Sequence, residues 1–154
     1  MPKRLSELFH TSKECSEHSC RINRKNVKQI YRPDAKQGFK NKTFVQKILG
    51  QEPKICDCII ECSDEKLIVI EILCGKLTAR ELLDKEKQLK NCCKVIEFIE
   101  QHNNIKHIIL YYEKKDSKSF AKNFAAKKKL TTPPQICGRK LLYKSGTYSL
   151  NIEC

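Results

Sequence analysis

The stretch ICDCIIECSDEKLIVIEILC, residues 55–74, decides the fold. It contains two runs rich in Ile, Val and Leu, Ile55–Cys62 and Lys66–Cys74, with Ser63-Asp64-Glu65 between them. Apolar runs of this length around a short polar segment predict two β-strands joined as a hairpin near the middle of a sheet. With a three-residue turn, residues whose numbers sum to 128 face each other across the hairpin.

The segment after the hairpin predicts a helix and a third strand. Thr78-Ala-Arg-Glu81 is a capping box, in which the threonine oxygen accepts from a first-turn amide, so a helix should begin there and run to about Glu100. Its apolar face comprises Leu82, Leu89, Cys92, Ile96 and Ile99. The run Lys106–Tyr112 predicts another strand.

The outer parts of the chain give weaker patterns. The first 40 residues predict irregular structure or short helices, and residues 42–49 predict a short helix that Gly50 and Pro53 end. Residues 114–130 have a weak helical stripe, and the tail from Arg139 to Ile152 predicts a hairpin that turns at Ser145-Gly146. We therefore expect an α/β fold, with a central mixed β-sheet flanked by helices.

The net charge of +13 is distributed unevenly along the 154 residues. Residues 1–50 hold 12 basic and 4 acidic side chains, residues 51–113 hold 9 and 12, and residues 114–154 hold 10 and 2. We expect one domain, in which a basic N-terminal segment and a basic C-terminal helix and hairpin bracket an α/β core. Such a charge indicates a polyanionic partner, with DNA or RNA first. The alternative is a solvated lysine-rich surface, as in an AT-rich genome or a heat-adapted organism.

The sequence predicts an intracellular location, cytoplasmic or in the nucleoid or nucleus, with no membrane partner. No run approaches the roughly 18 apolar residues of a membrane span, and the first ten residues lack the apolar stretch of a secretory signal. The ten cysteines are then expected to be reduced thiols or metal ligands, with disulfides only in a hyperthermophile. The sequence leaves a homodimer open.

Asp57 and Glu71 are the main candidates for a functional site. Each carboxylate lies in apolar sequence, and their numbers sum to 128, so the hairpin should place them opposite each other. Opposed carboxylates repel unless a positive group lies between them, and a divalent cation with oxygen ligands would meet that need. Two alternatives remain open: a two-residue turn that puts the pair on opposite faces, or neutralisation by a neighbouring Arg or Lys.

Residues 55–112 resemble the core of the PD-(D/E)XK nuclease superfamily, which includes restriction endonucleases, archaeal Holliday-junction resolvases and RecB-like nucleases. The resemblance is carried by Asp57 after an apolar approach, then Val-Ile-Glu71-Ile-Leu73-Cys-Gly75 and a helix. It implies a restriction-endonuclease-like fold and a hydrolase that cleaves DNA or RNA, with Asp57 and Glu71 binding Mg²⁺ or Mn²⁺. It also implies a role for Gln88, because RecB-like members often place a glutamine on this helix.

The chain departs from the family pattern at two positions. The family places a catalytic lysine two residues after the glutamate, where this chain has Leu73, and a proline before the aspartate, where it has Cys56. Lys66 and Lys76 lie nearby, and we name Lys76 as the candidate substitute, although on an extended strand it would face away from Glu71. The same fold without the lysine would bind nucleic acid and not cut it.

A third reading concerns the cysteines and histidines. Four potential zinc ligands occur within eleven residues: His10, Cys15, His18 and Cys20. They would make a small zinc-stabilised binding module, or else they are loose surface thiols and imidazoles. We expect Cys56, Cys58, Cys62 and Cys74, which lie within the predicted strands, to be small core residues.

The C-terminal basic flank is the predicted phosphate-binding surface. Its lysines crowd sixteen residues that hold one acid, Asp116: Lys114, Lys115, Lys118, Lys122, Lys127, Lys128 and Lys129. Lysines along one helix face suit phosphate contact without base readout. The leading hypothesis is thus a divalent-metal-dependent nuclease, and the alternatives are a non-catalytic nucleic-acid-binding protein on the same fold and the zinc-stabilised module.

Overall fold

A computed structural model describes residues 1–15, 25–73, 78–99, 104–113, 131–146 and 153–154. Within them the chain forms a six-stranded mixed sheet, in the order β1-β2-β3-β4-β5-β8. The strands are β1 (Thr11–Ser12), β2 (Val27–Tyr31), β3 (Cys58–Cys62), β4 (Leu67–Leu73), β5 (Ile105–Glu113) and β8 (Leu142–Gly146). The helices are α1 (Leu5–Leu8), α2 (Lys42–Leu49) and α3 (Ala79–Ile96), and a separate two-stranded ribbon joins β6 (Gln135–Ile136) and β7 (Arg139–Lys140). The predicted α/β class, a mixed sheet flanked by helices, is confirmed.

The β3–β4 hairpin lies at the centre of the sheet, with the predicted register. Cys58 pairs with Ile70, and Ile60 pairs with Ile68, so each pair of numbers sums to 128. The amide of Cys62 donates to the carbonyl of Lys66 at 2.8 Å and closes the three-residue turn. Because side chains alternate along a strand, this register decides which residues share a face with Glu71.

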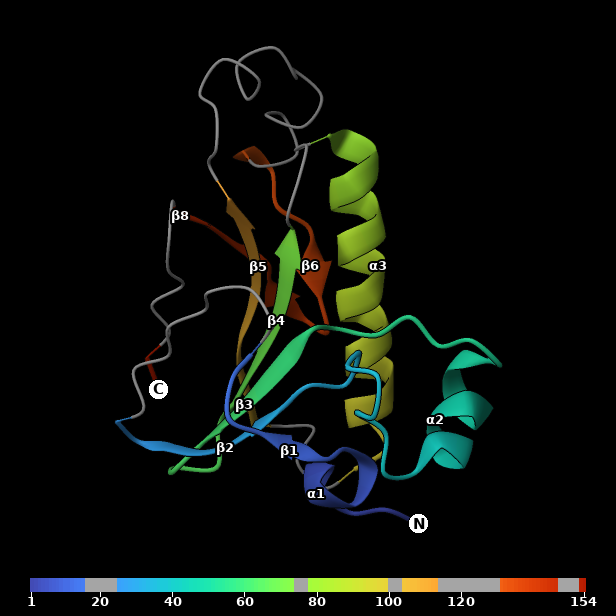
Figure 1. Cartoon of the computed structure of the whole chain (residues 1–154). Helices are drawn as coiled ribbons and strands as arrows, with labels where there is room; N and C mark the ends of the chain where they lie inside the picture. The colour runs from blue at the N-terminus through green and yellow to red at the C-terminus, as the bar shows by residue number, and fades with distance from the viewer. Residues whose placement is uncertain (16–24, 74–77, 100–103, 114–130, 147–152) are drawn as a thin grey trace.

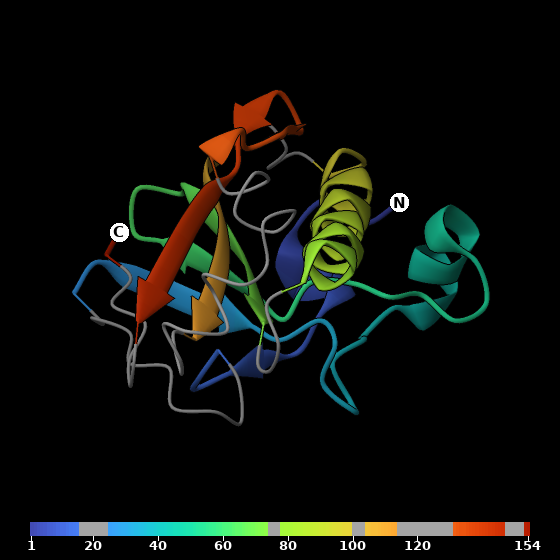
Figure 2. The same cartoon turned by 90° about the horizontal axis from the view of Figure 1, so that it is seen from above.

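Helix α3 connects β4 to β5, which runs parallel to β4. The helix begins where the capping box predicts, since the Thr78 hydroxyl accepts a hydrogen bond from the Glu81 amide at 3.1 Å. It lies along one face of the sheet, with α2 beyond it on the outer side (Figures 1 and 2). Leu82 and Leu89 are fully buried against the sheet. The helix is thereby fixed over the strand that carries Glu71.

Both faces of the sheet are apolar. Alternate residues of β4, among them Leu67, Val69 and Leu73, belong to the core beneath α3. The intervening residues, Ile68, Ile70 and Ile72, belong to a second apolar cluster on the opposite face. This double burial explains why β3 and β4 read as continuous apolar runs and not as alternating ones.

Four disulfides occur in the described part of the chain, and they pair every cysteine there: Cys15–Cys58, Cys56–Cys92, Cys62–Cys154 and Cys93–Cys137. The expectation of reduced thiols is therefore wrong for these cysteines, whereas Cys56, Cys58 and Cys62 are buried in the core as expected. Cys92 and Cys93 are both buried, and they bond to different segments, Cys92 to Cys56 and Cys93 to Cys137. Disulfides favour a non-reducing compartment, or the interior of a hyperthermophile, over a mesophilic cytoplasm.

Two further predictions at the ends of the chain are wrong. Residues 27–31, expected to be irregular or helical, form β2, which pairs with β3 and adds a strand to the sheet. The C-terminal hairpin turns at Cys137-Gly138, where both residues have positive φ, of 53° and 72°. Ser145 and Gly146 instead continue β8, which pairs in parallel with β5. The predicted helix at 114–130 lies outside the described residues.

Helix α3 also contacts the edge strand β8 through a partly buried hydrogen bond. The Tyr143 hydroxyl donates to Glu86 Oε1 at 3.0 Å, and Glu86 is only 3% exposed.

Among the described helices, none has the length and apolar character needed to cross a membrane.

Candidate functional site

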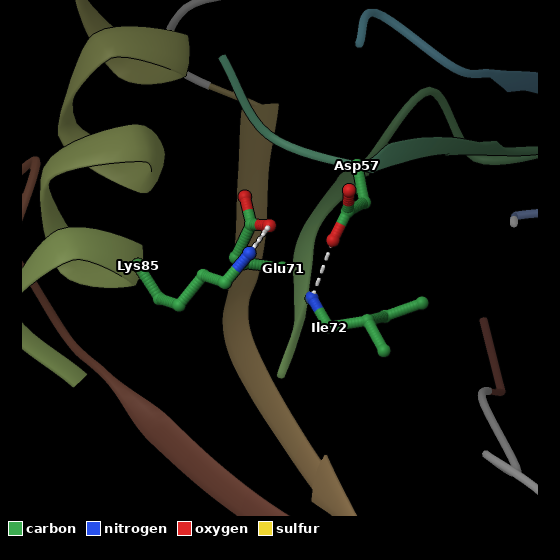
Figure 3. Close-up of polar contacts among 4 residues, drawn as sticks. All are labelled: Asp57, Glu71, Ile72 and Lys85. Atoms are coloured by element: carbon green, nitrogen blue, oxygen red, sulfur yellow. Dashed lines mark hydrogen bonds and ion pairs between the residues drawn. The ribbon is translucent and has the colours of Figure 1, made fainter. Parts of the chain in front are cut away.

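Asp57 lies immediately before β3, where the central hairpin opens. Its Oδ2 accepts a hydrogen bond of 2.7 Å from the backbone amide of Ile72 on β4 (Figure 3). Its carboxyl group is also hydrogen-bonded to the side chain of Glu71. The predicted cross-strand pairing of the two carboxylates is thus present, and a backbone amide fixes the position of one of them.

Glu71 is completely buried beneath α3, at 0% exposure. Lys85 extends from the helix so that its Nζ lies 3.4 Å from Glu71 Oε1, the ion pair drawn in Figure 3. One helical turn later, the Gln88 side-chain amide, with its nitrogen facing Glu71, donates to both carboxylate oxygens at 3.1 and 3.2 Å. Gln88, which the sequence resemblance singled out, therefore contacts Glu71, and Lys85 is a candidate site residue that sequence reasoning missed.

Asp34 is the second residue that the sequence did not single out. It lies in the turn after β2, and its carboxyl group is hydrogen-bonded to Asp57. The turn is closed by the Ala35 amide, which donates to the Arg32 carbonyl at 3.1 Å. Gly38 packs against the same turn so closely that a Cβ would come within 2.6 Å of the Pro33 carbonyl oxygen. The backbone thus holds a third carboxylate beside the predicted pair.

The three carboxyl groups differ in how readily they ionise. Burial, the hydrogen bond to Asp57 and the negative charge of Asp57 raise the pKa of Glu71 to about 11. Burial alone would also raise the pKa of Asp57, but the hydrogen bonds from Glu71, Asp34 and the Ile72 amide, together with the Lys85 charge, hold it below its ordinary value. Asp57 is therefore the ionised member, and Glu71 keeps its proton at neutral pH.

Asp34 and Lys85 complete the electrostatics of the cluster. Loss of hydration at the carboxyl group, the hydrogen bond to Asp57 and the charge of Asp57 raise the pKa of Asp34 to about 8, although the residue as a whole is exposed. Burial would lower the pKa of Lys85, but the charges of Glu71 and Asp57 outweigh it and raise that pKa. The site thus gathers three carboxyl groups around one ammonium group, and it balances the excess negative charge with protons.

The donor set fits a hard divalent cation. Carboxylate oxygens are the preferred ligands of Mg²⁺ and Mn²⁺, and Mg²⁺ is often held by one or two carboxylates plus water and substrate phosphate. Within the described ranges, no group of three or more His, Cys, Asp or Glu side chains is arranged to hold a metal ion. Asp57 and Glu71, the pair that the sequence resemblance names, are the residues that would hold such an ion, and Asp34 is hydrogen-bonded to Asp57.

The guanidinium group of Arg32 lies beside the carboxyl groups. Arg32 is close enough to Asp34 for its charge to lower the pKa of that carboxyl. Its buried Nε has no hydrogen-bond partner in the part of the chain that the structure describes. A buried donor without a partner is costly, and an anionic group at this place would satisfy it.

The other predicted site residues are not brought to this cluster. Leu73 shares the Glu71 face, as expected, and is buried in the apolar core at 2% exposure. Lys66 is exposed at the opposite end of β4. Lys76 and the phosphate-binding lysines at 114, 115, 118, 122, 127, 128 and 129 lie outside the described residues.

The zinc prediction rests on residues that the structure describes only in part. His10 is exposed, whereas Cys15 is buried and bonded to Cys58. His18 and Cys20 lie outside the described residues. Because zinc binds the thiolate form of cysteine, a zinc site at Cys15 and the Cys15–Cys58 disulfide exclude each other.

The chain was compared with protein-family models, curated proteins and solved structures, and none of them matches it.

Proposed function

We propose that this chain is a divalent-metal-dependent phosphodiesterase that acts on nucleic acid, with its site at Asp57 and Glu71. The observation that carries the proposal is a cluster of three carboxyl groups beside Lys85 and Gln88, in which Asp57 is hydrogen-bonded both to the buried Glu71 and to Asp34. A structural ion pair needs one carboxylate for one ammonium, and surplus buried carboxyl groups destabilise a fold unless a cation compensates them. Such clusters of perturbed carboxyl groups are typical of functional sites.

The fold supports the same proposal. The order of the β3–β4 hairpin, α3 and the parallel strand β5 agrees with what the resemblance to the PD-(D/E)XK superfamily implies for residues 55–112. A restriction-endonuclease-like core would place its acidic pair at the open end of the central hairpin, where Asp57 and Glu71 lie. Gln88, which the resemblance names independently, contacts Glu71.

Each residue of the cluster has a distinct task in this proposal. Asp57 and Glu71 would hold Mg²⁺ or Mn²⁺, and the bound ion would polarise a phosphoryl oxygen and lower the pKa of a water molecule. The Ile72 amide and Asp34 orient Asp57, and Gln88 orients Glu71. Lys85 supplies a preorganised positive charge that stabilises the charge developing on the phosphate, and the Arg32 Nε offers a donor to a substrate oxygen.

The test is cleavage of labelled single-stranded DNA, duplex DNA and RNA by the full chain with Mg²⁺, Mn²⁺ or EDTA. We expect cleavage with the metals and none with EDTA. Asp57→Asn and Glu71→Gln should each lower the rate by about 100-fold or more, because each removes a carboxylate ligand of the metal ion that stabilises the transition state. Glu97→Gln, at the exposed C-cap of α3, is the matched control and should cleave normally. Cleavage that survives both site substitutions would overturn the proposal.

A non-catalytic nucleic-acid-binding protein is the second candidate. It is favoured by Leu73 at the position of the family lysine and by the Lys85 ammonium group, whose positive charge offsets the negative charge of the cluster without any metal. In that case the wild-type chain would bind nucleic acid without cutting it. Calorimetric titration with Mn²⁺ would then show no binding, whereas the nuclease should bind Mn²⁺ and lose that binding in Asp57→Asn.

A further inference from the structure

A polar groove runs along the outer side of α3, next to the carboxylate cluster. Its volume is about 500 Å³, and it lies between the helix and the segment from the end of α2 to Lys54. Asn91 Nδ2 donates to the Lys54 carbonyl at 2.8 Å and so ties the two walls together. The groove is therefore part of the fixed architecture around α3.

The groove and the cluster share two residues. Lys85 and Gln88 line the groove, and both side chains contact Glu71. Any ligand seated in the groove would therefore lie against the two side chains that position this carboxyl group. The groove is thus an approach to the cluster from the helix side.

The charges of the groove fit a nucleotide better than an extended phosphate backbone. Its lining holds four cationic side chains, those of Lys54, Arg80, Lys85 and Lys87, and three acidic ones, those of Glu52, Glu81 and Asp84. Within the described residues no ion pair joins Arg80, Lys54 or Lys87 to these carboxylates. Cations suit phosphate oxygens, whereas carboxylates and amides accept from and donate to base edges. On a surface that binds the phosphate backbone of a duplex, the three carboxylates would repel the phosphates.

The size of the groove limits what can enter it. Pockets of roughly 300–1,000 Å³ enclose ligands of drug size, which is the scale of one nucleotide. A base pair with its two backbones does not fit such a volume, but an unpaired nucleotide does.

We propose that this groove binds an unpaired nucleotide of a single-stranded nucleic acid and directs its phosphate toward Glu71 and Lys85. The inference deepens the proposed function and depends on it for the fate of the phosphate. Arg80 and Lys87 hold the backbone, and Glu81 and Asp84 contact the base. The preferred substrate is then a single strand or an unpaired end.

The test measures binding without metal, so that it does not depend on cleavage. The full, disulfide-bonded chain is titrated in EDTA into a fluorescein-labelled single-stranded oligonucleotide and into the matching duplex, and anisotropy is recorded. The variant Arg80→Gln/Lys87→Gln removes two charges from the groove. The control Lys90→Gln/Lys94→Gln removes two charges from exposed positions on the same helix outside the groove.

We expect the groove variant to weaken single-strand binding about tenfold more than the control does, because each lost phosphate contact reduces counterion release. Both variants should weaken duplex binding equally. A nucleoside monophosphate should compete for the wild-type groove and compete less well for the groove variant. Equal loss of single-strand binding in both variants would overturn the inference, as would an equal loss of single-strand and duplex binding in the groove variant.

Failure of the inference can be told apart from failure of the proposed function. If the wild-type chain does not cleave but the groove variant selectively loses single strands, the groove assignment stands and the phosphodiesterase proposal falls. If the wild-type chain cleaves with Mn²⁺ and the groove variant binds single strands as the control does, the phosphodiesterase proposal stands and the groove assignment falls.

Discussion

Lys85 contacts Glu71, whereas position 73, where the family pattern would have a lysine, holds Leu73. Leu73 points into the apolar core, so an ammonium group there would lose its hydration without meeting a phosphate. The ammonium group of Lys85 comes to Glu71 from α3, whereas a lysine at position 73 would come from β4 itself. In the proposed nuclease, the positive group beside Glu71 would therefore come from α3 and not from β4.

We expect Lys85→Met to lower metal-dependent cleavage by about 100- to 1,000-fold, the usual effect of removing a preorganised charge. Methionine keeps the apolar stem of the side chain, so the loss should appear in kcat and not in thermal stability. Lys90→Met, an exposed position on the same helix, is the control. Unchanged kcat in Lys85→Met would remove Lys85 from the mechanism.

The pKa of Glu71 gives the metal-free protein a distinctive pH dependence. A carboxyl group whose pKa rises from 4.5 to about 11 on folding holds its proton more tightly in the folded state. Its contribution to stability is therefore complete below about pH 4.5 and is lost progressively as the pH rises. The pKa of Asp34 is raised to about 8, so its contribution to stability is likewise lost as the pH rises toward 8.

We expect the free energy of unfolding in EDTA to fall between pH 5 and pH 8, and to fall less in Glu71→Gln, which is neutral at every pH. Urea denaturation at several pH values measures this difference, and groups common to both proteins cancel in the comparison. Parallel pH profiles for the two proteins would show that Glu71 ionises normally.

At the scale of secondary structure, the sequence predicted the elements whose pattern is local. The β3–β4 register followed from the length of one turn, and the start of α3 followed from Thr78 and Glu81. Strand β2 was missed because Val27–Tyr31 is short, has two adjacent polar residues, Lys28 and Gln29, in place of an alternating pattern, and is stabilised by its pairing with β3. Its partnership with a distant strand is a tertiary effect, which local propensity does not report.

The missed strand explains the missed carboxylate. In the β2–β3 register Tyr31 pairs with Ile59, so the residues that follow β2 lie beside those that precede β3. Asp34 is then brought to Asp57 by the pairing. A correct prediction of β2 would therefore have identified Asp34 as a candidate site residue. Identifying Lys85 would also have required knowing how α3 packs on the sheet.

The Cys56–Cys92 disulfide ties the residue before Asp57 to α3, one turn beyond Gln88. It therefore joins the two elements that build the cluster. We expect Cys56→Ser/Cys92→Ser to lower the free energy of unfolding by about 3–4 kcal/mol, from the entropy of a loop of this size. It should also weaken Mn²⁺ binding, because the cluster is no longer held together.

The control for this prediction is Cys62→Ser/Cys154→Ser, which removes a disulfide at the other end of β3. It should lower stability in urea denaturation by a comparable amount and leave the calorimetric Mn²⁺ affinity unchanged. Equal Mn²⁺ affinities in the two double variants would show that the Cys56–Cys92 link does not organise the site.

At the scale of the whole molecule, the two basic flanks dominate the electrostatics. Residues 1–50 and 114–154 each carry a balance of +8, which the intervening −3 does little to offset. We expect the affinity for DNA or RNA to fall steeply as salt rises, because each neutralised phosphate releases counterions. Asp57→Asn should abolish cleavage but keep the slope of log K against log salt. An affinity that barely changes between low and physiological salt would contradict a polyanionic partner.

The disulfides also give the polypeptide a closed covalent topology. Cys93–Cys137 and Cys62–Cys154 both span the lysine-rich residues 114–130. One peptide bond broken by a lysine-specific protease in that stretch opens a ring and does not divide the molecule. The product should keep its mass, plus one water, until a reductant separates two fragments. The N-terminal fragment carries Asp34, Asp57, Glu71, Lys85 and Gln88, and the C-terminal fragment carries strand β8, which closes the sheet. A nicked, unreduced molecule therefore retains every described part of the cluster and of the sheet.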